Sequence, residues 1–430
     1  MKKNTVKGSL GAIALASVMT MSMGTPVFAQ AIWDMYDPAI GGTKTTTFDK
    51  YLVMDEEAEV PNASFTYAVT AGKAKAYDVA GKKFEVMAGV DADKVTMAGV
   101  GSKTANTITY KPGDATLNDE SALVKDYDKE SEKYAKKTAT LDFSACRFTE
   151  PGIYRYIVTE SGTNQGVTND ADATRVVDVY VNDDSDNPEH IKNNHYSYGL
   201  KIAGYVLHSN ADDAPDVSLG ENHGSAGAYA GTKSQGFTNS YDTSDIMIVK
   251  KVSGNQASRD KYFEFTVKIT DAVPGTVYYV SLLNTPETTP SNAATITANE
   301  GKTNPTTLTV GADGTVTQKF YLANGKAISI LGVAKGSKYE VTENAEDYKS
   351  RAIDAADFKY EEREEMHIKP AATSGTVASE DLITGYVNTR DGVIPTGVIM
   401  TVAPFAAVTL LGGVGAVTMV MKKRKSSEEE

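Results

Sequence analysis

The chain of 430 residues has little of three residue types: one cysteine, one tryptophan and five histidines. A single cysteine excludes an intramolecular disulfide, so this long chain has to resist unfolding and proteolysis by other means. Cys146 lies where apolar and polar residues alternate, and no histidine is close to it in sequence. Because a nucleophilic thiol needs a nearby base, the pattern indicates a buried structural cysteine.

Positive charge is also scarce, with 43 Lys and Arg residues against 56 Asp and Glu, which gives a net charge of −13 at pH 7. An acidic surface argues against nucleic acid as a partner and favours solubility. The histidines and the acidic runs lack the spacing of zinc or calcium ligands, so we expect no metal and no cofactor. A Ser-His-Asp arrangement is not apparent either, which argues against a hydrolase.

The C-terminal residues 391–430 combine three features in order. A short motif comes first, followed by an uncharged apolar run over 398–421 and by the basic cluster 422–425. A run of this length can span a bilayer, and the basic residues hold its end in the cytoplasm. The short motif reads Ile394-Pro395-Thr396-Gly397.

This order of motif, span and basic tail resembles the cell-wall sorting signal of Gram-positive surface proteins. The resemblance implies that a sortase cuts between Thr396 and Gly397 and passes the Thr carbonyl to an amine. The common form of the motif is Leu-Pro-x-Thr-Gly, whereas here Pro395 abuts Thr396, which leaves the sortase class open. The alternative is a plain C-terminal membrane anchor in which the motif is a juxtamembrane turn.

The N-terminus has the pattern of a secretory signal peptide. Three lysines precede an apolar run that extends from Leu10 to about Met23, and small residues follow Pro26. Cleavage after Ala29 or after Ala31 fits this pattern. A retained N-terminal helix is the alternative, but the run is short for a membrane span. We therefore expect export from the cell.

Between the two ends, the dominant hydrophobic period is two. Apolar and polar residues alternate over 263–269, 154–158 and 177–181, and Gly, Asn, Asp and Pro clusters separate such runs. This pattern is typical of antiparallel sheets packed as sandwiches. No convincing long amphipathic helix is present, although the charged residues 119–137 could form a short surface helix or a loop.

Three strand-like motifs recur in one order in two halves of the central chain, which indicates a duplicated domain. Each half has a Lys-bearing strand, then the pattern Tyr-x-Val-Thr-Glu, then the pattern Gly-aromatic-x-Asn. The motifs are further apart in the first half, so insertions are expected mainly in 73–140 and 183–230. A short link near 241–245 predicts domains stacked end to end. The predicted division is signal peptide 1–31, first sandwich 32–241, second sandwich 242–390 and sorting signal 391–430.

Strand parity places charged and polar residues of these motifs in the core. Lys50 shares its strand face with Phe48 and Leu52, because side chains alternate along a strand. An unpaired ammonium is unfavourable among apolar side chains, so it needs a partner there. The residues that point inward by this reasoning are Lys50, Glu160 and Asn239 in the first half and Lys250, Glu343 and Asn388 in the second.

A buried set of Lys, Glu and Asn can react. Burial lowers the pKa of a lysine and raises that of a glutamic acid, which favours a neutral amine and a protonated carboxyl. The carboxyl can polarise an amide carbonyl, and the amine can attack the Asn side-chain carbon. Ammonia leaves and an amide bridge remains. Both charges disappear in the reaction, which removes the penalty of burying them.

These motifs resemble the intramolecular isopeptide domains of Gram-positive pilins, in particular sortase-assembled backbone (shaft) pilins of streptococcal T-antigen type. The resemblance covers nearly the whole central chain and implies two tandem Ig-like or CnaB-like antiparallel β-sandwiches. It implies that Lys50 bonds to Asn239 with help from Glu160, and that Lys250 bonds to Asn388 with help from Glu343. The segments that carry it are TFDKYLVMDEEAEVPNASFTY, RFTEPGIYRYIVTE, GFTNS, MIVKKVSGN and YEVTE.

Each of these assignments has an alternative. Lys251 competes with Lys250, although its parity points it outward, and Glu150 competes with Glu160, although it precedes a Pro-Gly turn. Both triads could also be edge lysines and surface glutamates of ordinary sandwiches. In the family, an exposed Lys just before the first Asn strand accepts the Thr acyl group of the next subunit. Lys233 stands there in a Gly-rich stretch that a sortase could reach, and an ordinary loop lysine is the alternative.

The sequence therefore predicts a structural subunit of a covalently polymerised pilus, anchored to the cell wall of a Gram-positive bacterium. The implied partners are a sortase, further copies of the chain joined head to tail, peptidoglycan, and a tip or basal pilin. The chain would not be an enzyme with turnover, because each internal bond forms once. The alternative function is that of a wall-anchored adhesin or a minor or basal pilin that binds a host or microbial ligand.

Overall fold

The computed structural model describes residues 40–79, 81–98, 106–119, 124, 127–183, 200–216, 234, 236–283, 297–298, 302–354, 357 and 369–392. Apart from the short 3-10 helix η2 (Ala92–Lys94), the regular elements in these ranges are β-strands. The predicted all-β fold is confirmed. The suggestion of a helix over 119–137 is wrong where it can be compared, because strand β9 begins at Glu132. Tyr134, buried on this strand, provides the apolar contacts that favour a sheet position.

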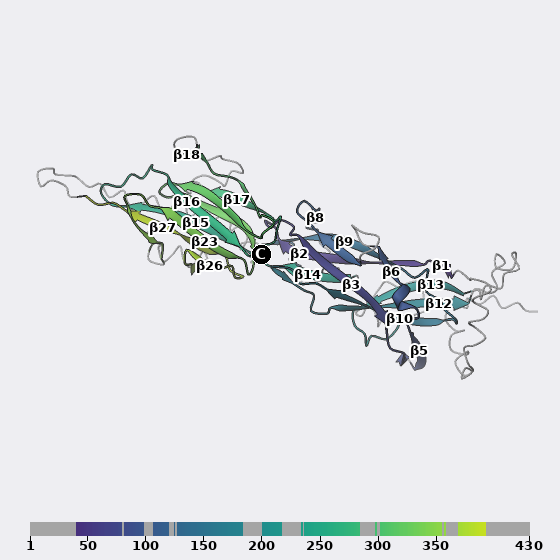
Figure 1. Cartoon of the computed structure of the whole chain (residues 1–430). Helices are drawn as coiled ribbons and strands as arrows, with labels where there is room; N and C mark the ends of the chain where they lie inside the picture. The colour runs from purple at the N-terminus through teal and green to yellow at the C-terminus, as the bar shows by residue number, and fades with distance from the viewer. Residues whose placement is uncertain are drawn as a thin grey trace, which may run out of the picture.

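Two sheets pack face to face in the first domain (Figure 1). Its larger sheet contains β1 (Gly41–Gly42), β13 (Leu200–His208), β12 (Thr174–Asp183), β10 (Gly152–Ser161), β3 (Ala63–Ala71) and β7 (Thr107–Tyr110) in that order, with β4 (Lys75–Val79) and β5 (Lys82–Ala88) at the side. The smaller sheet contains β11 (Val167–Thr168), β14 (Gly236–Tyr241), β2 (Thr45–Asp55), β9 (Glu132–Asp142) and β6 (Thr96–Ala98), with β8 (Thr116–Leu117) paired to β9.

The second domain repeats this two-layer plan. One sheet contains β20 (Thr307–Thr309), β17 (Val277–Leu283), β22 (Ala327–Ala334), β15 (Thr243–Ser253), β27 (Leu382–Thr389) and β24 (Lys349–Ala352), with β25 (Lys369–Pro370) paired to β27. The facing sheet contains β21 (Val316–Leu322), β16 (Phe263–Thr270), β23 (Lys338–Asn344) and β26 (Ser374–Thr376), and a separate hairpin is formed by β18 (Thr297–Ala298) and β19 (Lys302–Thr303).

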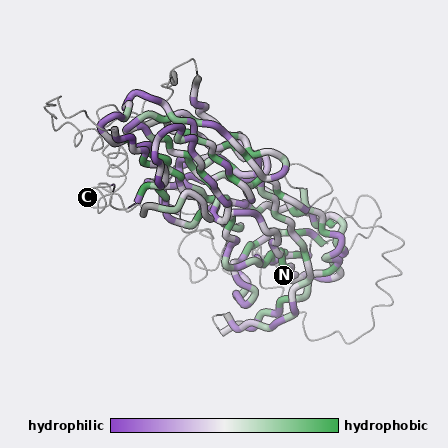
Figure 2. Tube along the Cα trace, turned by 60° about the vertical axis from the view of Figure 1, so that its left-hand side comes forward, coloured by the Kyte–Doolittle hydropathy of each residue, from purple (hydrophilic) through white to green (hydrophobic). Residues whose placement is uncertain are grey.

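Period-two alternation explains these layers. In β3, Phe65 and Tyr67 are buried, whereas Ser64 and Thr66 between them are exposed. In β16, Phe263 and Phe265 are buried in the same manner. Hydrophobic residues therefore line the interior of each sandwich and polar residues its outside, as Figure 2 shows along the chain trace.

Most strand pairs in the described ranges are antiparallel, but five are parallel, and two of these five carry the predicted lysines and asparagines. β2 pairs with β14 in parallel, and β15 pairs with β27 in parallel. Both Asn strands have a glycine of positive φ three residues before the asparagine, Gly236 at +148° and Gly385 at +142°. A Cβ on Gly236 would lie 1.7 Å from the carbonyl oxygen of Asp49, and one on Gly385 would lie 2.0 Å from that of Val249. The glycines let each Asn strand approach its Lys strand.

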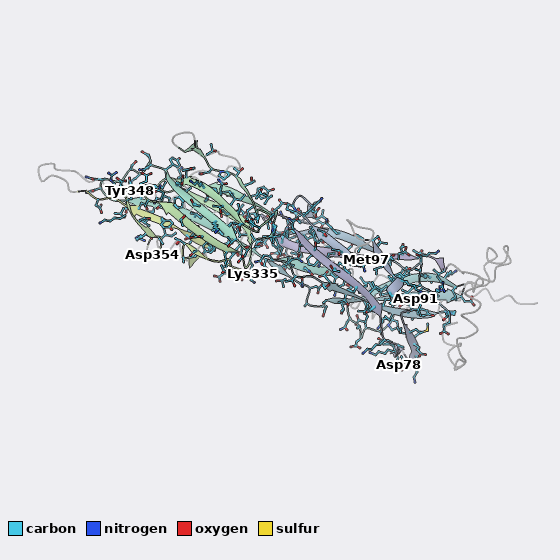
Figure 3. All side chains as sticks on the ribbon, viewed as in Figure 1. Asp78, Asp91, Met97, Lys335, Tyr348 and Asp354 are labelled. Carbon is cyan, nitrogen blue, oxygen red and sulfur yellow. The ribbon has the colours of Figure 1, made fainter. Side chains whose placement is uncertain are left out.

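The two domains meet end to end and form an elongated molecule (Figure 1). Only Asp242 separates β14 from β15. Its N–H donates to the Gly166 oxygen at 2.7 Å, and its own oxygen accepts from the Lys335 N–H at 3.0 Å. Lys335 lies where the domains meet (Figure 3). Tyr279 of the second domain donates to Glu59 of the first at 3.0 Å. Several polar contacts therefore supplement the short link.

Candidate functional sites: two buried triads of Lys, Glu and Asn

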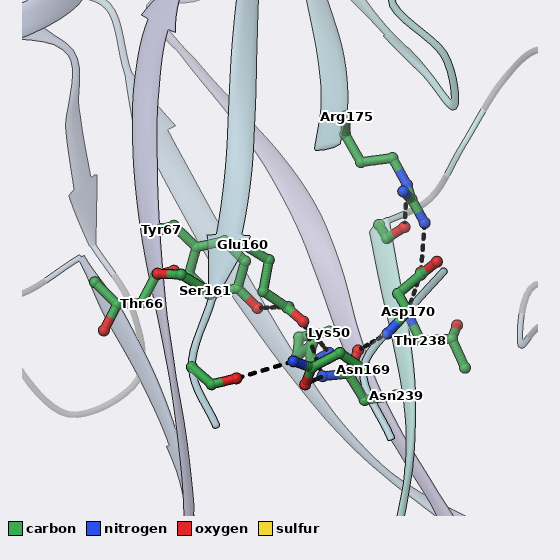
Figure 4. A network of polar contacts seen from close by, with 12 residues as sticks. Lys50, Thr66, Tyr67, Glu160, Ser161, Asn169, Asp170, Arg175, Thr238 and Asn239 are labelled. Carbon is green, nitrogen blue, oxygen red and sulfur yellow. Dashed lines mark hydrogen bonds and ion pairs between the residues drawn. The ribbon is translucent and has the colours of Figure 1, made fainter. Parts of the chain in front are cut away.

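Three strands of the first domain bring together Lys50, Glu160 and Asn239. Lys50 comes from β2, Glu160 from β10 in the opposite sheet, and Asn239 from β14. The Lys50 Nζ donates to Glu160 Oε1 at 3.0 Å, and the Asn239 Nδ2 donates to the same oxygen at 2.8 Å. Figure 4 shows this contact from close by. Lys50 is 0% exposed, Asn239 1% and Glu160 7%. Amine, carboxyl and amide thus share one buried site.

Strand register explains why Lys50 and Asn239 meet. In the parallel pair, Lys50 is opposite Phe237 and Leu52 is opposite Asn239. Lys50 and Asn239 are therefore diagonal neighbours on one face of the sheet. Glu160 reaches them from the facing sheet, where it is opposite Tyr67.

Burial makes the Lys50 amine easier to deprotonate. Removal from water lowers the pKa of Lys50 to about 8, against the opposing attraction of Glu160. The Nζ also lies 4.3 Å from the centre of the Phe65 ring, whose face favours a cation. Burial thus favours loss of the proton from Lys50, whereas Glu160 and the Phe65 ring favour the charged amine.

The Glu160 carboxyl has a third donor. The Tyr67 hydroxyl donates to Glu160 Oε2 at 2.6 Å. Tyr67 is itself buried, and its ring packs against Phe48 and Phe237. The aromatic residues thus fix the carboxyl between the amine and the amide.

A backbone donor that was not predicted from the sequence completes the first site. The N–H of Asp170 donates to Asn239 Oδ1 at 2.9 Å. Because a backbone N–H can only donate, it determines which end of the amide is oxygen. The Asn239 nitrogen consequently faces Glu160 Oε1, and it also donates to Asn169 Oδ1 at 3.1 Å. Glu160 therefore lies at the amide nitrogen of Asn239, and the Asp170 N–H lies at its carbonyl oxygen.

The second domain places Lys250, Glu343 and Asn388 in the equivalent positions. The Lys250 Nζ lies 2.5 Å from Glu343 Oε1, and both side chains are 0% exposed. Asn388 is also fully buried. In the parallel pair, Lys250 is opposite Tyr386 and Val252 is opposite Asn388. Burial again lowers the pKa of the lysine to about 8, opposed by Glu343.

The surroundings of the two triads match in shape and differ in polarity. Phe263 lies 4.3 Å from Lys250 Nζ, as Phe65 does from Lys50. Opposite Glu343 stands Phe265, which lacks the hydroxyl that Tyr67 offers Glu160. Within the residues that the structure describes, neither amide atom of Asn388 has a hydrogen-bond partner. The first triad therefore has more polar contacts than the second.

The alternative residues lie away from the two sites. The Lys251 side chain is 25% exposed and contacts Asp357 instead of Glu343. Glu150 is exposed in the turn before β10.

Cys146 is buried, and burial raises the pKa of its thiol to about 11, which suits an inert core residue. His208 is buried beside Asp178, with 3.0 Å between Nε2 and Oδ2.

Several predicted features lie outside the described residues, namely the signal peptide, Lys233, the motif Ile394-Pro395-Thr396-Gly397 and the apolar run after it. In the part of the chain that is described, no helix is long and apolar enough to cross a membrane. Within the same ranges, no group of three or more His, Cys, Asp or Glu side chains is placed to hold a metal ion.

Both domains match family models, and most of the chain is similar to a known protein. Residues 40–242 match a family model described as a Spy0128-like isopeptide containing domain, and residues 244–390 match one described as a domain of unknown function. A protein named pilin from Streptococcus pyogenes serotype M1 is 25% identical over 402 residues, which cover 90% of this chain and 93% of that protein. The chain is therefore similar to this streptococcal pilin over most of its length.

The solved structures to which this chain is similar include the major pilin of Streptococcus pyogenes. That structure is 20% identical, with a TM-score of 0.48, and the match covers 82% of this chain and 100% of that one. The T3.2 major pilin of the same organism is also 20% identical, with a TM-score of 0.42, over 81% of this chain and 100% of that one.

Proposed function

We propose that this chain is the structural shaft subunit of a covalent pilus, and that each of its two domains is locked by one internal Lys–Asn amide bond. The observation that carries the proposal is the buried contact of Lys50, Glu160 and Asn239 within a domain of the isopeptide family. The equivalent placement of Lys250, Glu343 and Asn388 supports a second bond.

In the proposed reaction, Lys50 transfers a proton to Glu160 and its neutral amine attacks Cγ of Asn239. A new N–C bond forms while the carbonyl oxygen takes up negative charge beside the Asp170 N–H. The protonated Glu160 lies 2.8 Å from the amide nitrogen and can protonate it. The C–N bond of the original amide breaks and ammonia leaves. The Lys50 nitrogen then gives its second proton to the Glu160 carboxylate, so that a neutral Lys–Asn amide and a neutral carboxyl remain. Each site reacts once, so the chain has no turnover.

Assembly is proposed to use a separate, external transpeptidase. A sortase would cut between Thr396 and Gly397 and join Thr396 to an amine of a neighbouring copy, for which Lys233 is the candidate, or to peptidoglycan. The contact is head to tail and does not close on itself, so repetition gives a filament. The fibre would stand on the surface of a Gram-positive cell, together with a tip or basal pilin.

Two measurements test this function. The mass of the folded chain should be lower than its sequence predicts by two ammonia molecules, and an unmodified mass would refute the internal bonds. Cell-wall extracts, boiled in detergent and separated by size, should give a ladder of covalent multimers. A single band would refute the shaft assignment and favour a wall-anchored adhesin or a basal pilin.

A further inference from the structure

A buried ion pair lies next to Asn239, whose side-chain carbon is the atom attacked in the proposed reaction. Arg175, the second residue of β12, donates from Nη2 to Asp170 Oδ2 at 2.6 Å. The side chains are 7% and 2% exposed. Such a pair is unfavourable to bury unless further hydrogen bonds satisfy both partners. Both have them here, as Figure 4 shows in part.

These further bonds join the Asp170 segment to the start of the Asn strand. Arg175 donates from Nε to the Gly236 oxygen at 2.7 Å and from Nη1 to the Asp172 oxygen at 2.7 Å. Asp170 Oδ2 also accepts from the Thr238 N–H at 2.9 Å. Gly236 and Thr238 lie just before Asn239 on β14. The guanidinium and the Asp170 carboxylate thus fix two backbone segments relative to each other.

These hydrogen bonds of Arg175 and Asp170 determine where the Asp170 N–H points. That N–H lies 2.9 Å from Asn239 Oδ1, the atom that becomes negatively charged when the amine adds to Cγ. A donor held at such an oxygen before reaction stabilises the transition state more than a mobile one. The same segment borders a surface pocket lined by Asn169, Asp170 and Asn239, which offers the released ammonia a way out.

We propose that Arg175 is a positioning residue for the first internal bond: through Asp170 it holds a backbone N–H on the carbonyl oxygen of Asn239 and so accelerates attack by Lys50. This inference rests on the proposed bond formation. The bond that forms and the ammonia that leaves are those of the proposed reaction, and Arg175 itself exchanges no proton.

The chain provides a matched control. Arg155 and Asp178 form a second buried Arg–Asp pair in the same sheet, with two hydrogen bonds of 2.7 Å and side-chain exposures of 3% and 0%. The Arg155 side chain donates to Asp178, Tyr77 and the Ala211 oxygen, and these bonds do not involve Asn239. Arg155→Met should therefore lower the stability of the domain by breaking a similar buried ion pair, but it should not displace Asn239.

The test follows both bonds in the full chain during cell-free synthesis. Samples are quenched in acid at intervals, digested, and scored by mass spectrometry for loss of the unreacted Asn239 and Asn388 peptides. Arg175→Met should slow the first bond about tenfold relative to the second, since a displaced oxyanion donor is worth at least this much. Arg155→Met should leave the ratio of the two rates unchanged, and Arg175→Lys should recover part of the loss.

An unchanged ratio in Arg175→Met would overturn the inference, as would an equal change in Arg155→Met. If Arg175→Met does not fold, as judged by trypsin resistance of the first domain, Arg175→Lys decides by the same ratio. Failure of the proposed function looks different, because the wild-type chain would then lose no ammonia at either site.

Discussion

The Tyr67 hydroxyl donates a hydrogen bond to Glu160 Oε2 at 2.6 Å. In the second domain Phe265 occupies the corresponding place opposite Glu343, and no hydroxyl is available from that ring. There the Ser350 hydroxyl donates to Glu343 Oε2 at 3.1 Å, and the Tyr386 hydroxyl donates to the Val341 oxygen at 2.9 Å. Phe237 is the residue that corresponds to Tyr386 in the first domain. The two sites have therefore exchanged tyrosine and phenylalanine between facing sheets.

Replacing Tyr67 with Phe should weaken the unreacted first domain without preventing its bond. A hydrogen bond to a charged group contributes about 1.5–3 kcal/mol, and Phe265 shows the ring alone at the matching position. We expect this loss on urea denaturation when Asn239→Ala also keeps the domain unreacted. The Tyr67→Phe chain with Asn239 intact should still lose both ammonia molecules. Failure of its first bond would assign Tyr67 a necessary role.

Removing either carboxyl should abolish one bond only. Glu160→Ala leaves Lys50 and the Asn239 amide without proton transfer, and Glu343→Ala does the same for Lys250. Each variant should retain one more ammonia than wild type, as intact mass would show. Its affected domain should lose on the order of a few kcal/mol of stability, because a cross-link over a loop this long constrains the unfolded chain. Loss of both bonds in one variant would contradict independent sites.

Stability of an unreacted first domain should rise with pH. The folded-state pKa of Lys50 is about 8, below its ordinary value of 10.5. Between these values the unfolded chain holds one more proton than the folded chain, so the free energy of unfolding increases with pH. For Asn239→Ala, the gain from pH 7 to pH 9 should be about 1 kcal/mol.

The control for this pH dependence is Asn239→Ala combined with Lys50→Met, which has no titrating amine. Its urea midpoint should change less over the same pH interval. Equal pH dependence with and without Lys50 would show that the lysine is not buried as a titrating amine in the unreacted domain.

Strand alternation was enough to predict the all-β fold and to direct Lys50 and Glu160 toward the core. It does not report strand direction, because parallel and antiparallel strands alternate alike. The parallel pairing of β2 with β14 therefore came only from the structure. In the sequence, this pairing is reflected in the Gly of the Gly-aromatic-x-Asn motif, because Gly236 permits the close approach of the two strands.

The Asp170 contact was beyond prediction for a different reason. Its donor is a backbone N–H, and every residue except proline has one. Only the fold places this N–H on Asn239 Oδ1. The buried pair of Arg175 and Asp170 would have been a sequence signal only if β12 were known to start beside β14. Side-chain chemistry could be inferred from the strand motifs, whereas backbone chemistry required coordinates.

Processing at the C-terminus should leave Thr396 as the last residue of wall-released protein. The motif lies directly before the apolar run, where a membrane-held sortase can reach it. Digestion and mass spectrometry of wall-released material should find peptides that end at Thr396, joined to an amine. Thr396→Ala should leave the chain in the membrane fraction. Peptides from 398–421 in the wall fraction would contradict cleavage.

Replacing Lys233 with Arg should abolish covalent multimers and leave both internal bonds intact. The substitution keeps the positive charge but removes the amine that would attack the acyl group on Thr396. Lys233 stands six residues before Asn239 in a Gly-rich stretch, outside both triads, so the mass loss of two ammonia molecules should not change. Lys201→Arg, on strand β13 of the same domain, is the matched control and should keep the ladder. A ladder that persists in Lys233→Arg means that another lysine is the acceptor, and the shaft assignment then depends on finding it by mass spectrometry of the dimer band.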